Sequence, residues 1–571
     1  MLETTVRDPG VLDAWRRRAL AGCAELRWPA PRAVAIAHAG GASLAVAAPV
    51  DQLFTATEVN EWALAASIAE YDPAKAPELV AALAAEQREE AELPALGTPG
   101  ALLRLRRRAA LESNPKLRAL VEAARARALP WLLDDEALTL GAGAGGQSWP
   151  LLELPDPAAV AWQSLRAIPI ALVTGTNGKT TVVRLLAACT KAAGLETGYS
   201  CTDGVFVSDR ALGTGDYSGP AGARRVLRDS AVEAAVLETA RGGILRRGLA
   251  VGRADVAVIT SIAADHFGEY GINDLEALVD VKLAVARALD GRGLLVANAD
   301  DALLARHAAA AGKPVGWFAQ DADAARLAEH RRSGGATAGV RAGRLVLSHA
   351  GVEHDLGKIA AMPLAAGGHS HFNVLNLATA ALGAAGLGIA PSTIAAVFAA
   401  FGANPEDNAG RLMRYELGGI NLIVDFAHNP AALAGLADFA QHLRGAGRLA
   451  LLLGQAGNRV DADIDRLAVV AVAARPDLVV VKELGTYLRG RDSGEVPALL
   501  KRALAQAGLA PEAVADAPDE DRAVRLALAW ARAGDVLVLP LHSRDGRGRA
   551  LALFERLRRE GWRAGRPLPP A

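Results

Sequence analysis

Short apolar runs alternate with longer segments of helical periodicity through the middle of this chain. Between residues 166 and 405 the apolar runs that read as strands are 169–174, 234–238, 255–261 and 293–298. Segments with apolar residues at helical spacing lie between them, among them 180–193 and 275–289. Strands that alternate with helices are typical of a mostly parallel sheet covered on both faces. The pattern therefore predicts an α/β domain over residues 166–405.

The same alternation returns after a break at "FGANPEDNAGR", which we interpret as a hinge linker. The apolar runs that follow are "INLIVDFAH", "RLALLLG", "DLVVVKE" and "DVLVLPL", with helical segments between them. Residues 406–571 are therefore predicted to form a second, smaller doubly wound unit, a Rossmann-like C-terminal domain.

The pattern before residue 166 is different. The stretch "AVAIAHAGGASLAVAAP" indicates two short strands around a Gly-Gly turn, and residues 58–128 show helical spacing. "GAGAGGQSWP" then indicates a flexible or turn-rich stretch. We expect residues 1–165 to form a separate α+β domain, in which we recognise no motif. The predicted fold is thus α/β, in three domains at 1–165, 166–405 and 406–571.

Charge and composition argue against some classes of partner. The 571 residues include 62 Lys and Arg and 63 Asp and Glu, so a net charge of −1 gives no reason to expect nucleic acid or an anionic membrane as a partner. The N-terminal "MLETTVRDPG" lacks the apolar core of a secretory signal, and no uncharged apolar stretch reaches the roughly 18–20 residues of a membrane span. We therefore expect a cytoplasmic protein. The three cysteines lack metal-ligand spacing and are expected to fill space in the core.

The first predicted strand of the central domain runs into "TGTNGKTT", residues 174–181. A glycine-rich loop at a helix N-terminus binds phosphate oxygens through backbone N–H groups. Lys179 would then contact the β- and γ-phosphates, and Thr180 would bind Mg²⁺. A purely structural turn, the alternative, does not require Lys-Thr-Thr directly after the glycines. We predict a P-loop domain whose phosphate-binding residues are Gly175, Thr176, Asn177, Gly178, Lys179, Thr180 and Thr181.

The form T-G-T-N-G-K-T-T resembles the Mur ligase superfamily, which includes cell-wall muramyl peptide ligases, folylpolyglutamate synthetase and the C-terminal half of cyanophycin synthetase. The segment "LETARGGIL" is most similar to the last of these. The resemblance implies that Glu238, and His266 in "AADHFGEYG", bind Mg²⁺; an ordinary hydrogen-bonded histidine is the alternative for His266. It also places Lys282 where several members carry a carbamylated lysine that binds a second Mg²⁺, with a solvated helix lysine as the alternative.

Further motifs follow in the order that the superfamily has them. In "FNVLNLATAAL" the resemblance implies that Asn373 binds the adenine edge, with helix capping as the alternative. In "NAGRLM", Arg411 would reach the terminal phosphate when the domains close. In "DFAHNP", Asp425 would bind the ribose hydroxyls and His428 would face the substrate.

The segment "YLRGRDSGE" resembles one in cyanophycin synthetase, in which Arg489 and Arg491 would bind a substrate carboxylate bidentately. A solvated basic loop is the alternative. Two features depart from the superfamily members. No ATP-grasp pattern is visible in residues 1–165, and "LPLHSRDGRGR" stands where cell-wall ligases have Gly-Lys-Gly-His-Glu. The cell-wall substrate therefore becomes less favoured.

The resemblance implies an ATP-dependent, ADP-forming ligase that uses ATP and Mg²⁺. It would join a small amino acid to a carboxylate of a peptide or polymer through an acyl phosphate, with Lys179, Glu238, His266, Lys282 and Arg411 as the catalytic set. The most similar members favour arginine and an acidic side chain, and an ATP-grasp synthetase is a candidate partner. Two alternatives stay open: a ligase that extends a polyglutamate-type tail, and a catalytically degraded, nucleotide-binding partner subunit of a synthetase.

Overall fold

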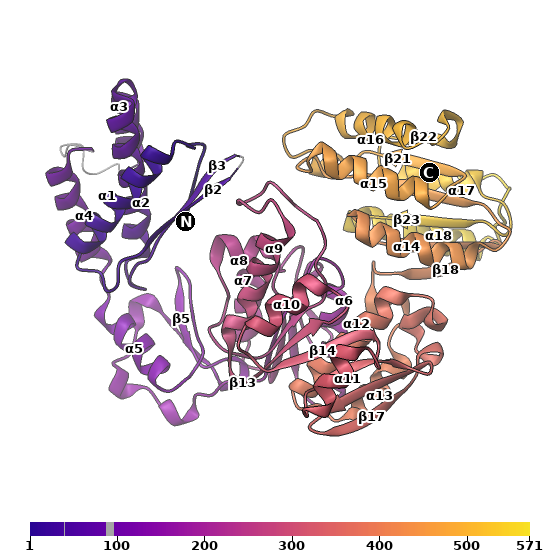
Figure 1. The fold of residues 1–571 in the computed structure, drawn as a ribbon, viewed down its shortest axis with the longest axis horizontal. Coiled ribbons are helices and arrows are strands. Elements are labelled where there is room, and N and C mark those ends of the chain that lie inside the picture. The colour runs from indigo at the N-terminus through magenta and orange to yellow at the C-terminus, as the bar shows by residue number, and fades with distance from the viewer. Residues whose placement is uncertain (39, 87–95, 571) are drawn as a thin grey trace.

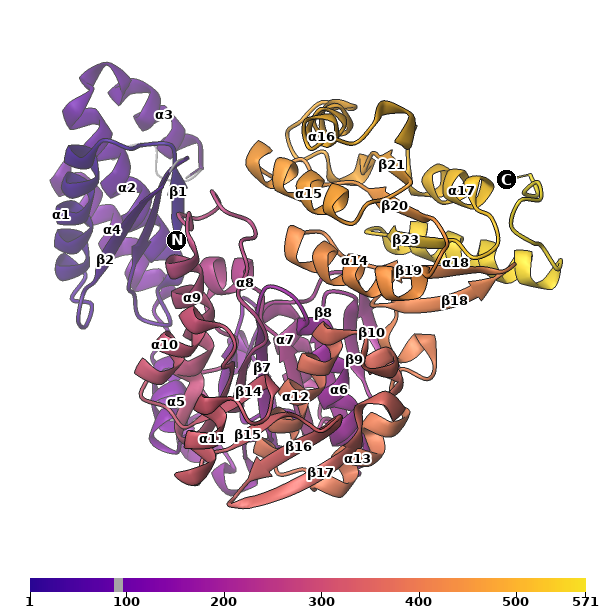
Figure 2. The same ribbon diagram turned by 45° about the vertical axis from the view of Figure 1, so that its right-hand side comes forward.

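The computed structural model describes residues 1–38, 40–86 and 96–570, with the backbone alone for 83–86. Figures 1 and 2 show a central region that carries the N-terminal region on one side and the C-terminal region on the other. Within the described residues the strands form four sheets, of three, eleven, six and three strands. The domain boundaries at 165/166 and 405/406 stay predictions.

The N-terminal region contains two small antiparallel sheets. The first has the order β1-β3-β2 and comprises β1 (Leu2–Thr4), β2 (Ala33–His38) and β3 (Gly41–Val46), with helices α1 (Pro9–Glu25), α2 (Leu53–Tyr71), α3 (Ala76–Glu86) and α4 (Thr98–Glu112). One face of β3 packs with Trp15 and Trp62 of the helices in a single core. The second sheet comprises β4 (Trp131–Leu133), β5 (Ala137–Leu140) and β6 (Gln147–Pro150), next to α5 (Pro115–Ala126).

These elements confirm the two strands predicted around the Gly-Gly turn and the helical character of the described part of 58–128. Residues 87–95 of that stretch lie outside the described residues. The stretch 141–150, predicted to be flexible or turn-rich, contains the 3-10 turn Gly143–Gly145, which confirms the turns; the flexible alternative is wrong, because these glycines are buried and β6 follows. Gly143 is required there, since a Cβ on this residue would lie 2.1 Å from the carbonyl oxygen of Val232 in the central region.

The central region is built on the large sheet, in the order β10-β9-β8-β11-β7-β12-β13-β14-β15-β16-β17. Its strands are β7 (Ile170–Thr174), β8 (Thr197–Cys201), β9 (Gly204–Val207), β10 (Arg210–Thr214), β11 (Ala234–Glu238), β12 (Ala254–Ile259), β13 (Leu289–Asn298), β14 (Val315–Asp321), β15 (Thr337–Arg341), β16 (Arg344–His349) and β17 (Val352–Lys358). The strands from β8 to β15 in the sheet order are parallel, and antiparallel strands flank them at both edges. The mostly parallel sheet and all four predicted strands are confirmed.

Two layers of helices cover this sheet. One face packs on α6 (Lys179–Ala192), α12 (His371–Gly386) and α13 (Pro391–Ala400), the other on α7 (Pro220–Arg228), α9 (Leu275–Leu283), α10 (Ala302–Ala310) and α11 (Ala325–Arg332). The helix predicted at 275–289 ends earlier, because residues 284–288 tighten into a 3-10 turn that leads into β13. The strands are buried on both faces, which explains their continuous apolar runs.

The C-terminal region has its own six-stranded sheet, in the order β18-β19-β23-β20-β21-β22, in which β18 is antiparallel. The strands are β18 (Met413–Leu417), β19 (Ile420–Asp425), β20 (Leu449–Leu453), β21 (Leu478–Lys482), β22 (Val514–Ala517) and β23 (Val536–Pro540). Helices α14 (Pro430–Arg444), α15 (Asp461–Ala473) and α16 (Glu495–Gln506) cover one face, and α17 (Glu520–Trp530) and α18 (Arg544–Arg559) the other. The second doubly wound unit is therefore confirmed.

Two further expectations can be compared with the structure. Cys23, Cys189 and Cys201 are buried and unbonded to one another, as expected for core residues. No helix in the described part of the chain combines the length and the apolar character that crossing a membrane requires.

Candidate active site

The glycine-rich loop (residues 174–181) connects the end of β7 to the start of α6. Gly175 has φ +142°, and a Cβ there would lie 1.9 Å from Thr260 Oγ1. Gly178 has φ +84°, and its Cβ would lie 2.3 Å from Asn376 Oδ1. Both positions therefore require glycine. Within the described chain no side chain caps α6, so its first N–H groups are open to an anion, as at a phosphate-binding helix N-terminus.

A cavity of about 310 Å³ lies against this loop and is shared by the central and C-terminal regions. Its lining includes the loop from Thr176 to Thr181, Glu238 at the end of β11, and three predicted residues from later in the chain: Asn373, Arg411 and Asp425. His428 also lines it. The parallel strands β7, β11 and β12 all end here, which is where open α/β sheets bind ligands.

Glu238 is buried, with 1% of its surface exposed, and its carboxylate accepts hydrogen bonds from hydroxyl groups. Thr180 Oγ1 lies 2.8 Å from Glu238 Oε2, and Thr202 Oγ1 lies 3.0 Å from Oε1. A carboxylate and a hydroxyl side by side, next to the loop, form the hard oxygen set that Mg²⁺ prefers. The residues present therefore fit Mg²⁺ at Thr180 and Glu238.

Lys282 of α9 lies under the glycine-rich loop. Its Nζ donates to the carbonyl oxygen of Gly175 at 2.7 Å, and only 4% of the residue is exposed. Burial, reinforced by the charge of Lys179, holds the pKa of Lys282 well below its ordinary value. The solvated-lysine alternative is therefore wrong. Lys179 itself donates to the carbonyl oxygen of Thr176 at 2.9 Å.

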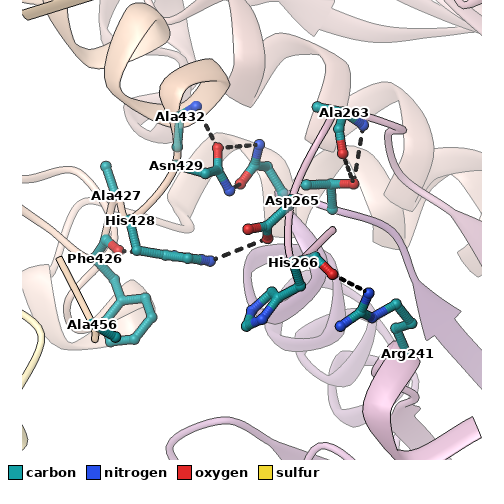
Figure 3. Close-up of polar contacts among 12 residues, drawn as sticks. Arg241, Ala263, Asp265, His266, Phe426, Ala427, His428, Asn429, Ala432 and Ala456 are labelled. Atoms are coloured by element: carbon teal, nitrogen blue, oxygen red, sulfur yellow. Dashed lines mark hydrogen bonds and ion pairs between the residues drawn. The ribbon is translucent and has the colours of Figure 1, made fainter. Parts of the chain in front are cut away.

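The ring of His266 lies between an acidic and a basic partner. Figure 3 shows its backbone carbonyl oxygen as the acceptor of a hydrogen bond from Arg241. Its Nδ1 is 3.1 Å from Glu269 Oε1, and Arg459 Nη2 of the C-terminal region is 2.9 Å from its Nε2. Since arginine donates, Nε2 is the acceptor and Nδ1 carries the proton. Burial lowers the pKa of His266 below its ordinary value, and the charge of Arg459 adds to this, against the raising effect of Glu269 and Asp265. In this arrangement both ring nitrogens of His266 have partners on the chain.

Asp265 joins the same contact between the two regions. Figure 3 shows His428 pointing to Asp265. His428 Nε2 lies 3.5 Å from Asp265 Oδ2, and Arg459 Nη1 lies 2.8 Å from Oδ1. Although burial opposes it, these partners hold the pKa of Asp265 far below its ordinary value. Asp265, His266 and His428 lie close enough to share a metal ion, but Arg459 brings a positive charge to the same carboxylate. The sequence interpretation missed Asp265 and Arg459, and the Asp before His266 was the available signal.

Arg411 and Asp425 lie where the linker enters the C-terminal region. Arg411 Nη2 is 3.4 Å from Thr180 Oγ1, and its guanidinium stands 4.6 Å over the Phe426 ring. Both oxygens of Asp425 accept backbone N–H groups, from Leu412 and Ala427, each at 2.7 Å. Burial raises the pKa of Asp425 above its ordinary value against these partners. In this structure Asp425 therefore holds the linker to the end of β19.

Asn373 and Asn376 do not cap α12, whose N-cap is Ser370. Asn373 Nδ2 donates to the carbonyl oxygen of Leu364 at 3.2 Å, and Asn376 Nδ2 donates to Asn373 Oδ1 at 3.1 Å. The capping alternative is wrong. Because both asparagines line the cavity, their amides are available there for polar recognition.

Arg489 and Arg491 are placed differently from each other. Arg489 is exposed and lies 5.3 Å over the Tyr487 ring. Arg491 donates at 2.7–2.9 Å within the C-terminal region, and its four acceptors are the carbonyl oxygens of Gly457 and Arg459 and the carboxylates of Asp461 and Glu495. Arg491 thus fixes the loop that carries Arg459. Substrate binding by either arginine stays a prediction.

The chain matches known proteins over these same regions. Residues 173–384 match the Mur ligase middle domain, and residues 410–540 match the domain described as Mur ligase, glutamate ligase domain. A cyanophycin synthetase of Trichormus variabilis is 36% identical over 375 residues, 65% of this chain and 41% of that protein. The chain thus spans about two fifths of the length of the cyanophycin synthetases it matches.

A second group of relatives is matched over more of its length. The UDP-N-acetylmuramoyl-L-alanyl-D-glutamate–2,6-diaminopimelate ligase of Xanthomonas campestris is 31% identical over 379 residues, 64% of this chain and 70% of that protein. Among solved structures, E. coli FolC in complex with DHPP and ADP is 20% identical, with a TM-score of 0.49 over 68% of this chain and 89% of that one.

Proposed function

Because this chain belongs to the Mur ligase family, we propose that it is an ATP-dependent ligase that forms an amide bond between an amino acid and a carboxylate of a peptide or polymer. One observation carries the proposal. A helix N-terminus without a side-chain cap, a buried carboxylate–hydroxyl pair and an arginine from the linker all line one cavity between two regions. Those are the groups that phosphoryl transfer requires.

In the proposed reaction, the groups of this chain first bind ATP and Mg²⁺, and two chemical steps follow. The N–H groups of the glycine-rich loop and Lys179 would bind the β- and γ-phosphates of ATP. Thr180 and Glu238 would hold Mg²⁺, which supplies charge neutralisation on the phosphates when bound. The acceptor carboxylate attacks the γ-phosphorus, the bond to ADP breaks, and an acyl phosphate forms. The amine then attacks the acyl carbon, phosphate leaves, and the amine loses a proton.

Closure of the two regions protects that intermediate from water. The contacts of Asp265 with His428 and Arg459 join the regions beside the cavity. Arg411 would stabilise charge on the transferred phosphoryl group, Asn373 would bind adenine and Asp425 the ribose. His266 and Lys282 are proposed as further metal-binding residues; for His266 this requires Arg459 to release its Nε2.

The proposed substrates rest on the resemblance of the sequence motifs to those of cyanophycin synthetase. We propose that the amine is a basic amino acid such as arginine and that the acceptor is an acidic side chain of a peptide or polymer. The amine would bind in the C-terminal region, near His428 and the exposed Arg489. An ATP-grasp synthetase is proposed as a partner, and a cytoplasmic location stays a prediction.

The test is phosphate release from ATP with a panel of amino acids and short acidic peptides. A ligase releases phosphate only when both substrates are present, and the peptide gains the mass of one amino acid residue. Glutamate as the preferred amine would favour the polyglutamate-type alternative. Tight nucleotide binding without turnover, in the presence of every pair, would contradict the ligase and favour a degraded partner subunit.

A further inference from the structure

Asp203, in the turn between β8 and β9, faces three arginines. Arg184 Nη2 lies 2.9 Å from its Oδ2, and Arg547 Nη2 lies 3.3 Å from its Oδ1. Arg411 Nη2 lies farther away, at 3.9 Å from Oδ2, beyond hydrogen-bond distance. All four side chains are at most 15% exposed. One carboxylate is therefore shared by three guanidinium groups in a mostly buried place.

The three arginines come from three different parts of the molecule. Arg184 belongs to α6 of the central region and also donates to the carbonyl oxygen of Ala409 at 2.9 Å. Arg411 belongs to the linker and lines the cavity at the glycine-rich loop. Arg547 belongs to α18 of the C-terminal region. The contact between Arg547 and Asp203 therefore exists only when the C-terminal region lies against the central one.

The charges compete for the same carboxylate. Burial by itself raises the pKa of Asp203, but the charges of Arg411, Arg184 and Arg547 together hold that pKa below its ordinary value, so the group is an anion. Arg184 and Arg547 each hydrogen-bond one of its two oxygens. Arg411 instead stacks on Phe426 and points toward Thr180. If Arg547 left, Asp203 would lose one of its two hydrogen-bonding cations, and the next nearest cation is Arg411, 3.9 Å from Oδ2.

Gly410 gives independent evidence that the position of Arg547 matters to the linker. Gly410 has φ +75°, and a Cβ there would lie 2.2 Å from Arg547 Nη1. The guanidinium thus passes directly over the residue that precedes Arg411. The positive φ already disfavours a larger residue at 410, and a Cβ there would also require the end of the Arg547 side chain to move.

We propose that Arg547 is a positioning residue: by occupying Asp203 in the closed molecule, it leaves Arg411 free to bind the terminal phosphate of ATP. Opening of the C-terminal region would withdraw Arg547, and Asp203 would then draw Arg411 away from the phosphate site. The inference rests on the proposed function, since it assigns the terminal phosphate to Arg411. It adds that closure of the C-terminal region determines whether Arg411 can reach the terminal phosphate.

The experiment is calorimetric titration of the full chain with ADP and with the imido analogue of ATP, in Mg²⁺. The preference is the Kd for ADP divided by the Kd for the ATP analogue. We expect this ratio to be about tenfold smaller in Arg547→Gln than in the wild type, because Asp203 then pairs with Arg411. Adding Asp203→Asn to that variant removes the trap and restores most of the preference. If Arg547 had only a structural role, the double variant would show a lower preference than Arg547→Gln, since it removes both partners of the contact. The Arg547→Lys variant keeps the charge and should retain most of the preference.

Arg549→Gln is the matched control, because Arg549 lies on the same helix and pairs with Asp521 at the surface. Its preference should equal that of the wild type. Melting curves separate loss of folding from loss of preference. Two results would overturn the inference, provided that the wild type prefers the ATP analogue. One is an unchanged preference in Arg547→Gln. The other is a double variant, Arg547→Gln with Asp203→Asn, that does not regain the preference. If the wild type binds neither nucleotide, the proposed function fails first, and the inference fails with it.

Discussion

Asn177 of the glycine-rich loop and Asn429 at the start of α14 exchange two side-chain hydrogen bonds across the two regions. Asn429 Nδ2 donates to Asn177 Oδ1 at 2.9 Å, and Asn177 Nδ2 donates to Asn429 Oδ1 at 3.2 Å. The same Oδ1 of Asn429 accepts the N–H of Ala432 and so caps α14. A residue of the phosphate-binding turn is thereby tied to a helix of the other region, next to His428.

Replacing Asn429 separates these two roles. Asn429→Asp keeps the cap but loses the donor to Asn177, so we expect a roughly fivefold rise in the KM for ATP, from the loss of about 1 kcal/mol, with little change in stability. Asn429→Ala also loses the cap and should cost about 1 kcal/mol of stability. Steady-state kinetics and melting curves of both variants test this. Equal kinetics of Asn429→Asp and wild type would show that the pair does not contribute to closure.

Lys179 should be essential for turnover. Its ammonium lies at the first residue of α6, where the γ-phosphoryl group would develop charge during transfer, and removing such a group costs roughly 10²–10³-fold or more in kcat. We therefore expect Lys179→Ala to be inactive in the phosphate-release assay while it folds normally. Lys191→Gln, on the same helix but paired with Asp209 at the surface, is the control and should retain activity. Wild-type rates in Lys179→Ala would overturn the P-loop assignment.

Lys282 is predicted to react with carbon dioxide. Carbamylation requires a neutral amine, and the lowered pKa of the buried Lys282 raises its neutral fraction near neutral pH. We expect a carbamate signal in NMR spectra after labelling with isotopic bicarbonate, and loss of that signal in Lys282→Gln. Removing dissolved carbon dioxide should lower turnover, and bicarbonate should restore it. A wild-type spectrum without the signal would contradict the prediction.

A buried ionic cluster in the C-terminal region predicts acid sensitivity. Lys482 is fully buried at the end of β21, and its Nζ lies 2.6 Å from Glu520 Oε1 and 3.4 Å from His542 Nδ1. Burial, aided by the charge of Lys482, lowers the pKa of His542 to about 3, and its Nε2 bonds the carbonyl oxygen of Ala427 at 3.0 Å. Although burial opposes it, Lys482 and His542 lower the pKa of Glu520 to about 2. The cluster therefore holds the loop before His428 in place.

Both lowered pKa values have the same sign of effect on stability. A group whose pKa is lower in the folded state stabilises the fold above its unfolded pKa and loses that contribution as pH falls toward the folded value. Protonation of His542 in the unfolded state should therefore lower the free energy of unfolding by roughly 1.4 kcal/mol per pH unit below pH ~6.5. Glu520 should add to this decrease below pH ~4.5.

The measurement is the melting temperature as a function of pH, from neutral pH to about pH 5, in the window set by the ordinary histidine pKa. His542→Gln cannot take up a proton, so its melting temperature should fall less steeply than that of the wild type. His371→Gln is the control, because the His371 side chain is 68% exposed. Parallel curves for wild type and His542→Gln would contradict the prediction.

Much of the fold was readable in the sequence because its signals are local. The strand 234–238 and the loop 174–181 were found from apolar runs and glycines that act within a few residues. The edge strands β10 and β17 were missed, since they are only partly buried and lack a continuous apolar run. Five strands inside the sheet, β8, β9, β14, β15 and β16, were not predicted either. The flexible alternative for 141–150 was wrong for a different reason: Gly143 allows close packing against Val232, which no local pattern reports.

The sequence by itself determined the chemistry that depends on order along one strand-to-helix turn: the glycine-rich loop, Lys179 and Thr180, because these are neighbours in the chain. Only the tertiary structure decided which distant charges meet, and at what distances. Asp203 and Arg547 are separated by more than half the chain, as their numbers show. No pattern in either local segment predicts that the two side chains form a contact. Arg411 thus depends on electrostatic neighbours that only domain packing supplies, because charge interactions act through space and not along the sequence.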